Sequence, residues 1–305
     1  PEMSRGLGDV YKRQMYAKTK KEAEALMDFD RVIARWPKAE SAAAAWQRAA
    51  QIYAGRQDMA NMAKYYEGLI QNFPKASPAA LAEAHFLLGR AAFDQGDFKS
   101  SISHMAEAKT LDPQKYGEQV NVLSVLSYHK LQDMNKLKEA LETLQKENPS
   151  AVARVPDVIP AWLGLQAYGM KDLETADKYM TWATQNDQLQ NVKKVIWRNL
   201  AKVRLALRKY DRALVASNNF LKDEDQPYRR ADGMLDKASI LLGLGKYADA
   251  RKTAEDALAL GVEGPLMASL KIVLGDISYA EKKFDEAAKH YGVTAELFVN
   301  DAELK

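Results

Sequence analysis

The chain has 305 residues, and its 47% hydrophobic and 28% charged content is that of an ordinary folded protein. The formal net charge of +3 is too small for a nucleic-acid-binding surface, so we expect no nucleic-acid partner. No apolar run is long enough for membrane insertion, and none is expected. The lack of cysteine excludes disulfides, thiolate catalysis and cysteine-based metal sites.

The two ends of the chain differ from its middle. Residues 1–14 do not share the repeat that fills the rest of the sequence, and they resemble translated adapter sequence joined to an incomplete reading frame. We interpret them as a non-native leader and leave them out of the fold prediction. No polar capping helix follows the last repeat, although repeat arrays need one. We therefore expect 15–305 to be a piece truncated at both ends, with Leu297 and Phe298 covered by further sequence.

From residue 15 onward, two positions twelve residues apart, most often occupied by small residues, recur every 36 to 39 residues. A fixed period in this range is typical of stacked supersecondary units. Two helices approach closely only where the side chains at their crossing are small, so each pair predicts one helix crossing. The clearest pairs are Gly164 with Ala176, Ala201 with Ala213, Ala238 with Ala250, and Gly275 with Ala287. The second positions, which we call anchors, are Ala25, Met62, Ser101, Leu137, Ala176, Ala213, Ala250 and Ala287.

Each repeat is predicted to contain two helices. In one of them, apolar residues recur at helical spacing over 81–93, stop at the Asp-Gln-Gly-Asp segment 94–97, and resume over 98–111 before Pro113. Glycine and proline mark the breaks between the predicted helices of the other repeats in the same way. No run of alternating β-branched residues predicts a sheet. The pattern favours an all-α solenoid of about seven helical pairs preceded by a partial one.

These repeats resemble the tetratricopeptide repeat family, whose unit carries Trp, Leu-Gly, Tyr, Ala, Phe and Pro at set offsets. The first complete unit has Trp46, Tyr53, Tyr66 and Pro74 at such places. The resemblance covers nearly the whole chain after residue 15, although the units are longer than the family's usual 34 residues. It implies a right-handed α-solenoid and a protein–protein interaction scaffold or adaptor, not an enzyme, with a partner peptide or helix in its concave groove.

Second helices that end in an aromatic-Pro pair, as in segments 28–37 and 65–74, resemble those of bacterial envelope proteins with these repeats. The resemblance favours a bacterial source and the periplasm or cell envelope over the cytoplasm. Two alternatives to a scaffold or adaptor stay open. In one, the repeats are the regulatory region of a larger enzyme or sensor. In the other, they are an architectural part of a large envelope complex.

Residues that carry chemistry are few. The four histidines have no metal-ligand spacing, and His85 and His104 are placed to approach across one helix pair in a structural role. There is no Gly-rich phosphate loop and no Gly-x-Ser-x-Gly motif. Acidic residues are spread along helix faces, as on a solvated surface. We therefore expect no cofactor and no metal.

The resemblance also implies where a partner would bind, because first helices line the concave surface in this family. The second to fourth helical pairs present an apolar and aromatic stripe there, and the fifth adds two basic residues one turn apart. One interpretation is a groove with aromatic anchors and a basic end that binds an acidic group. The other is core packing between neighbouring first helices, beside a solvated basic pair. The candidate residues are Phe86, Arg90, Phe93, Val122, Leu126, His129, Leu165, Tyr168, Arg198 and Lys202.

Overall fold

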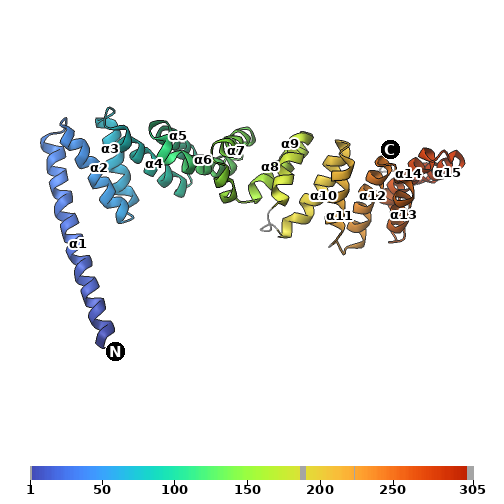
Figure 1. Cartoon of the computed structure of the whole chain (residues 1–305), viewed down its shortest axis with the longest axis horizontal. Coiled ribbons are helices and arrows are strands. Elements are labelled where there is room, and N and C mark those ends of the chain that lie inside the picture. The colour runs from blue at the N-terminus through green and yellow to red at the C-terminus, as the bar shows by residue number, and fades with distance from the viewer. Residues whose placement is uncertain (1, 186–189, 223, 301–305) are drawn as a thin grey trace. The chain divides into compact units, whose positions relative to one another are not determined.

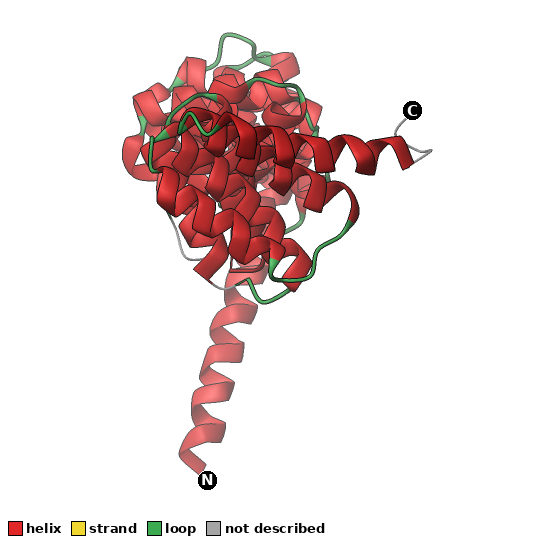
Figure 2. Ribbon diagram, turned by 90° about the vertical axis from the view of Figure 1, so that its right-hand side faces the viewer, coloured by secondary structure: helices red, strands yellow, loops and turns green. Residues whose placement is uncertain are grey.

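The computed structural model describes the backbone of residues 2–185, 190–222 and 224–300, and the side chains of 19–185, 193–222 and 224–293. Helices joined by short loops make up these residues, and no strand occurs among them (Figure 1, Figure 2). The chain divides into two compact units, Pro1–Val155 and Pro156–Lys305, which we describe one at a time.

Unit 1 begins with a long helix, continues with three helical hairpins and ends with a short 3₁₀ helix. The long helix is α1 (Glu2–Arg35). The hairpins pair α2 (Glu40–Gly55) with α3 (Met59–Asn72), α4 (Pro78–Asp94) with α5 (Phe98–Leu111), and α6 (Pro113–Lys130) with α7 (Met134–Glu147). The 3₁₀ helix η1 (Pro149–Arg154) packs against α6 and α7.

Unit 2 consists of four hairpins. They pair α8 (Val158–Gly169) with α9 (Leu173–Thr184), α10 (Gln190–Ala206) with α11 (Tyr210–Lys222), α12 (Pro227–Gly243) with α13 (Tyr247–Leu258), and α14 (Gly264–Ala280) with α15 (Phe284–Asn300). Each first helix from α10 onward also packs against the second helix of the preceding hairpin. The predicted all-α solenoid of paired helices is confirmed.

The small residues lie where the two helices of a hairpin cross. A Cβ added to Gly164 would lie 2.7 Å from Cγ and 2.9 Å from the backbone nitrogen of Met180, so no larger residue fits there. A Cβ added to Gly275 would lie 2.4 Å from Cε1 of Tyr291. In both hairpins the side chain that covers the glycine comes four residues after the anchor, one helical turn along the second helix. The small residue therefore makes room for a larger one from the facing helix.

The turn inside each hairpin repeats with the same period. One residue of each turn has a positive φ and lies five residues before the anchor. An aspartate often follows it and caps the second helix, as when Asp97 accepts a hydrogen bond from the backbone N–H of Ser100 at 3.1 Å. The positive-φ residues are Gln57, Gly96, Gln132, Lys171, Arg208, Gly245 and Lys282.

Residues 2–14, which the prediction left out as a leader, lie in α1. One feature of unit 1 differs from the prediction. The linker after α7 forms η1, whereas the sequence predicted only a connection there. Leu297 and Phe298 lie outside the described side chains. Over the part of the chain that the structure describes, no helix has the length and apolar character needed to cross a membrane.

The turn geometry predicts opposite effects for two Gly→Ala substitutions in unit 2. At Gly245, where φ is +71°, alanine should lower the free energy of unfolding by about 1 kcal/mol, because a Cβ disfavours left-handed backbone. At Gly169, the last residue of α8, alanine should raise it by about 0.5 kcal/mol through helix propensity. Neither added Cβ would meet an atom within 4 Å. Urea denaturation followed by circular dichroism measures the free energy of unfolding of both variants. Changes of the same sign in the two variants would contradict the prediction.

Candidate functional site

Helix α4 carries three of the candidate residues at positions i, i+4 and i+7, which places them on one side of the helix. Phe86 is buried and stacks on Tyr116 of α6, with 4.6 Å between the ring centroids. Phe93 is half-buried and makes an edge contact with Phe98 at 5.4 Å. Arg90, between the two rings along the helix, is exposed.

These residues border a cavity of about 400 Å³ within unit 1, formed by α4, α6 and η1. Its volume lies in the range of ligand pockets, roughly 300–1,000 Å³. The buried side chains of Phe86 and Val122 form an apolar floor, whereas half-buried Phe93 and the exposed Arg90 and Asp94 lie at the rim. The cavity can therefore take an apolar side chain together with a charged or hydrogen-bonding group. The lining residues are Phe86, Arg90, Phe93, Asp94, Gln119, Val122, Leu123 and Arg154.

More positively than negatively charged side chains border this α4–α6 cavity. Arg154 forms an ion pair with Glu118 of α6. Arg90 makes no ion pair with any residue whose side chain the structure describes. Two guanidinium groups and one carboxylate, that of Asp94, therefore border the cavity, and one of the guanidinium groups is available to an acidic partner.

The structure thus brings together four predicted residues, Phe86, Arg90, Phe93 and Val122. Two of them, Phe86 and Val122, are buried in the floor. Leu126 and His129 lie further along α6 and do not line the cavity. Burial, followed by the charge of Lys130, lowers the pKa of His129, which favours its neutral form.

The candidate residues of unit 2 pack against or pair with other residues of that unit. Leu165 and Tyr168 pack against the apolar cluster of α8 to α11. Arg198 forms an ion pair with Asp232 of α12 and lies over the ring of Phe220, 5.9 Å from its centroid.

The second basic residue of unit 2 is also matched within the chain. Lys202 lies 3.8 Å from a carboxylate oxygen of Asp236, on α12. Burial raises the pKa of Asp236 to about 6, although Lys202 and Arg198 both oppose the rise. Aspartates of the neighbouring first helix therefore supply counter-charges for both residues of the predicted basic pair.

Sequence analysis missed Gln119, Leu123 and Arg154. Gln119 and Leu123 flank the predicted Val122 on α6, and Arg154 comes from the unexpected η1. The interval of 39 residues between Leu137 and Ala176 was a signal, since it showed extra residues in that linker. It carried no information on where an inserted side chain would lie.

Other cavities of unit 1 have different linings. One of about 550 Å³ lies between α1 and α2, where Arg56 Nε donates a hydrogen bond to Glu22 at 3.0 Å. Another of about 460 Å³ lies beside the α3–α4 loop, and its lining mixes alanines and Phe73 with polar residues such as Gln47 and Lys75. The α4–α6 cavity remains the best candidate because it joins two aromatic rings with an unpaired guanidinium.

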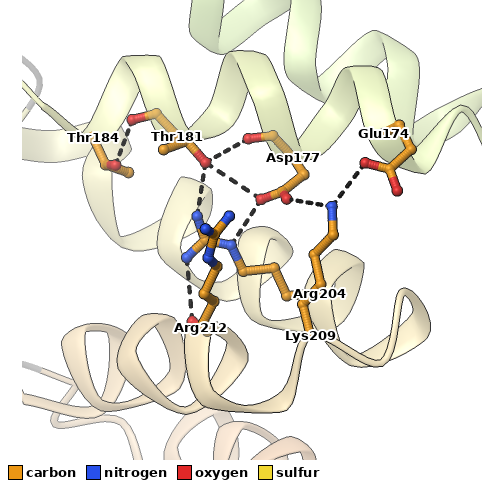
Figure 3. A network of polar contacts seen from close by, with 7 residues as sticks. All are labelled: Glu174, Asp177, Thr181, Thr184, Arg204, Lys209 and Arg212. Carbon is orange, nitrogen blue, oxygen red and sulfur yellow. Dashed lines mark hydrogen bonds and ion pairs between the residues drawn. The ribbon is translucent and has the colours of Figure 1, made fainter.

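A connected polar cluster lies in unit 2, between α9 and the α10–α11 hairpin (Figure 3). Asp177 accepts hydrogen bonds from Arg204 Nε at 2.7 Å and from Lys209 Nζ at 3.0 Å. Arg204 also donates to the Thr181 hydroxyl at 2.7 Å, and Lys209 to Glu174 at 2.7 Å. Burial by itself raises the pKa of Asp177, but the hydrogen bonds from Arg204 and Lys209 outweigh it and hold this pKa below its ordinary value.

This Asp177 cluster is structural. Asp177 and Arg204 are both buried, and Arg204 further donates to the backbone oxygen of Arg212 at 3.2 Å. The cluster therefore joins α9 to the next hairpin, and its charged groups are already paired with one another.

The histidine pair approaches as predicted. The Nδ1 atoms of His85 and His104 are 3.0 Å apart, so one ring can donate a hydrogen bond to the other when neutral. Burial lowers the pKa of both rings, and in His85 the neighbouring His104 lowers it further. Among the described residues, no group of three or more His, Asp or Glu is arranged to hold a metal ion.

Stacked helical hairpins, with charges matched between neighbours, define an α-solenoid of the interaction-scaffold class. Models described as tetratricopeptide repeat match residues 44–76, 80–116 and 235–295. These three segments of the chain are tetratricopeptide repeats. Proteins built from these repeats are generally non-enzymatic scaffolds, and the fold supports a role in protein–protein interaction. No curated protein matches the sequence.

Solved structures resemble the chain at low sequence identity. A chain of the Naa15/Naa10 complex bound to HypK-THB is 15% identical, with a TM-score of 0.50; the match covers 86% of this chain and 38% of that one. PilF of Pseudomonas aeruginosa is 18% identical, with a TM-score of 0.38 and coverage of 74% and 96%. A tetratricopeptide repeat protein from Parabacteroides merdae is 14% identical, with a TM-score of 0.36 and coverage of 91% and 96%.

The Asp177 cluster predicts a large stability effect from one carboxylate. Asp177→Asn should lower the free energy of unfolding by about 3 kcal/mol, because buried Arg204 loses its counter-charge. The pKa of Asp177 is depressed from 3.8, so its stabilisation is complete above that pH and is lost as the pH falls through the folded-state pKa. As the pH falls below about 4, the free energy of unfolding of the parent should therefore drop more than that of Asp177→Asn, so the difference between the two proteins should shrink.

The matched control is Glu174→Gln, which removes the exposed partner of Lys209 and should cost less than about 1 kcal/mol. Denaturation curves between pH 3 and pH 7 measure both variants. Equal costs at pH 7 would show that the buried pair is not what stabilises this part of unit 2.

Proposed function

We propose that this protein is an interaction scaffold that binds a short segment of a partner protein in the α4–α6 cavity. The segment carries a bulky apolar side chain and a nearby carboxylate. The apolar side chain enters between the rings of Phe86 and Phe93, and the carboxylate meets Arg90. Peptide recognition by aromatic pockets beside a cation is a common mode in repeat proteins and other peptide binders.

The observation that carries the proposal is the combination of half-buried Phe93 with exposed Arg90 on the rim of one cavity. A ring that is partly open to solvent has apolar surface left to bury against a partner, unlike Phe86, whose face is covered by Tyr116. A guanidinium without an ion pair also has its hydrogen-bond donors available. Arg198 and Lys202 lack that second property, which favours unit 1 over unit 2 as the binding region.

The proposal predicts that Phe93→Ala combined with Arg90→Ala weakens peptide binding at least about tenfold. Peptides are selected from a random phage-displayed library on the full chain, and their affinities are then measured by fluorescence anisotropy. The selected peptides should share an apolar residue next to Asp or Glu. Phe86 is left intact, because removing a buried ring costs about 3–5 kcal/mol and would disturb the fold.

The control variant combines Trp36→Ala with Arg31→Ala, an exposed aromatic and an exposed arginine of unit 1 outside the cavity. Circular dichroism establishes that both variants keep their helicity. The proposal is wrong if the two variants bind the selected peptides equally, or if selection yields no peptide that binds the parent chain.

A further inference from the structure

The two histidines of the α4–α5 hairpin form a contact whose chemistry depends on pH. His85 of α4 and His104 of α5 are both half-buried, and their Nδ1 atoms are 3.0 Å apart. The ring centroids are 5.2 Å apart, close to the largest separation that two imidazoles with this nitrogen distance can have. The two nitrogen atoms therefore point at one another. This arrangement suits a hydrogen bond and not a shared metal ion, whose ligand nitrogens would converge at an angle.

The hydrogen bond requires that at least one of the two facing nitrogen atoms carries no proton. When both rings are neutral, or when only one is protonated, one Nδ1–H donates to the lone pair of the other Nδ1. When both rings are protonated, both nitrogen atoms are donors, and two like charges lie at hydrogen-bond distance. Protonation of both rings therefore converts an attractive contact between α4 and α5 into a repulsive one.

The surroundings of the rings set the pH at which this happens. Glu107 of α5 acts on both rings, whereas Glu67 of α3 and Asp97, the N-cap of α5, act on His104, and each of these carboxylates favours protonation. Burial outweighs them and holds the pKa of both rings below the ordinary 6.5, and the neighbouring ring lowers the pKa of His85 further. The stabilisation of the hairpin is therefore complete above about pH 6.5, and is lost as the pH falls from there through the lowered pKa values.

Close packing beside the rings ties their separation to that of the helices. A Cβ added to Gly89, one turn after His85, would lie 3.1 Å from Cβ of His104 and 3.1 Å from Cγ of Met105. The base of the His104 side chain is therefore held against the backbone of α4, and Met105 next to it is buried. Repulsion between the two rings accordingly acts on the distance between α4 and α5.

The other hairpins of unit 1 have no such pair at the corresponding positions. The two histidines lie four residues before the small position of the first helix and three residues after the anchor of the second. The corresponding residues are Trp46 and Tyr65 in the α2–α3 hairpin, with ring centroids 5.3 Å apart, and Asn121 and Ala140 in the α6–α7 hairpin. Neither of these pairs gains charge as the pH falls below 7. Acidification therefore loosens this contact in the α4–α5 hairpin and not in its neighbours.

We propose that the histidine pair is an acid-sensitive clasp, which holds α4 against α5 near neutral pH and releases α4 when both rings are protonated. Release displaces Phe86, Arg90 and Phe93, the α4 residues that border the α4–α6 cavity. Acidification thus weakens the binding of a partner segment in the cavity. That consequence rests on the proposed function, whereas the opening of the hairpin does not.

Native-state hydrogen exchange of the full chain tests the clasp without any ligand. The opening constants of the α4 and α5 amides, corrected for the intrinsic exchange rate, should rise at least about tenfold between pH 7 and pH 5, because each proton gained on opening contributes a factor of ten per pH unit. The α8–α9 hairpin has no histidine in its sequence. Its opening constants should change less than about twofold over the same range.

Replacements taken from the neighbouring hairpins remove the titrating groups. His85→Asn/His104→Ala introduces the residues of the α6–α7 hairpin, and His85→Trp/His104→Tyr introduces those of the α2–α3 hairpin. In both variants the opening constants of α4 and α5 should no longer depend on pH between 5 and 7. His129→Gln is the matched control, because His129 is half-buried on α6 outside the pair and its loss should preserve the response of the parent.

The peptides selected for the cavity give a second measurement. Their affinity should fall in proportion to the closed fraction that hydrogen exchange reports, since only the closed hairpin is competent to bind. A selection that yields no peptide contradicts the proposed function and leaves the exchange test of the clasp valid.

Three results would overturn the clasp. The first is a set of opening constants in α4 and α5 that does not change between pH 7 and pH 5. The second is the same pH dependence in the parent and in a double variant that keeps its helicity. The third is full protonation of both rings, followed by nitrogen chemical shifts, while α4 and α5 stay protected, because the rings would then turn into solvent without parting the helices.

Discussion

The close approach of the two helices in each hairpin is the constraint on which the rest of the structure depends. At Gly164 an added Cβ would meet both the side chain and the backbone of Met180, so the separation of α8 and α9 is set by the lack of a side chain. A larger residue would push the helices apart and displace the surface on which the next hairpin stacks. Because a solenoid is held by interfaces between neighbours, such a displacement would pass along the array.

Charged residues that the sequence alone would leave available to a ligand form ion pairs between neighbouring hairpins. Arg204 and Asp177, and Lys202 and Asp236, belong to neighbouring hairpins, and each pair satisfies charges that would otherwise be available to a ligand. Basic residues on a first helix therefore do not by themselves indicate a binding site in such a protein. Arg90 differs because no described carboxylate pairs with it, and this difference is visible only in the folded chain.

Residues at the same position of the repeat differ in burial along the chain. Phe86 is covered by Tyr116 of the following hairpin, whereas Ile272, at the equivalent position of α14, retains more than a third of its surface. Both residues are apolar at the same offset from their anchors, so periodicity alone cannot distinguish them. What decides is whether a helix packs over the position, which is a property of the neighbour and not of the residue.

The sequence by itself determined the helical class, the pairing of helices and the repeat period, because these depend on local spacing of small and apolar residues and on turn residues such as Gly96. Together with the resemblance to the repeat family, it also placed Phe86, Arg90, Phe93 and Val122 among ten candidate binding residues on first helices. Only the tertiary structure decided that Phe86 belongs to the floor, that Arg198 is already paired and that Arg154 reaches the cavity from η1. Those facts depend on contacts between residues about 30 or more positions apart, and no local pattern records which side chains will meet.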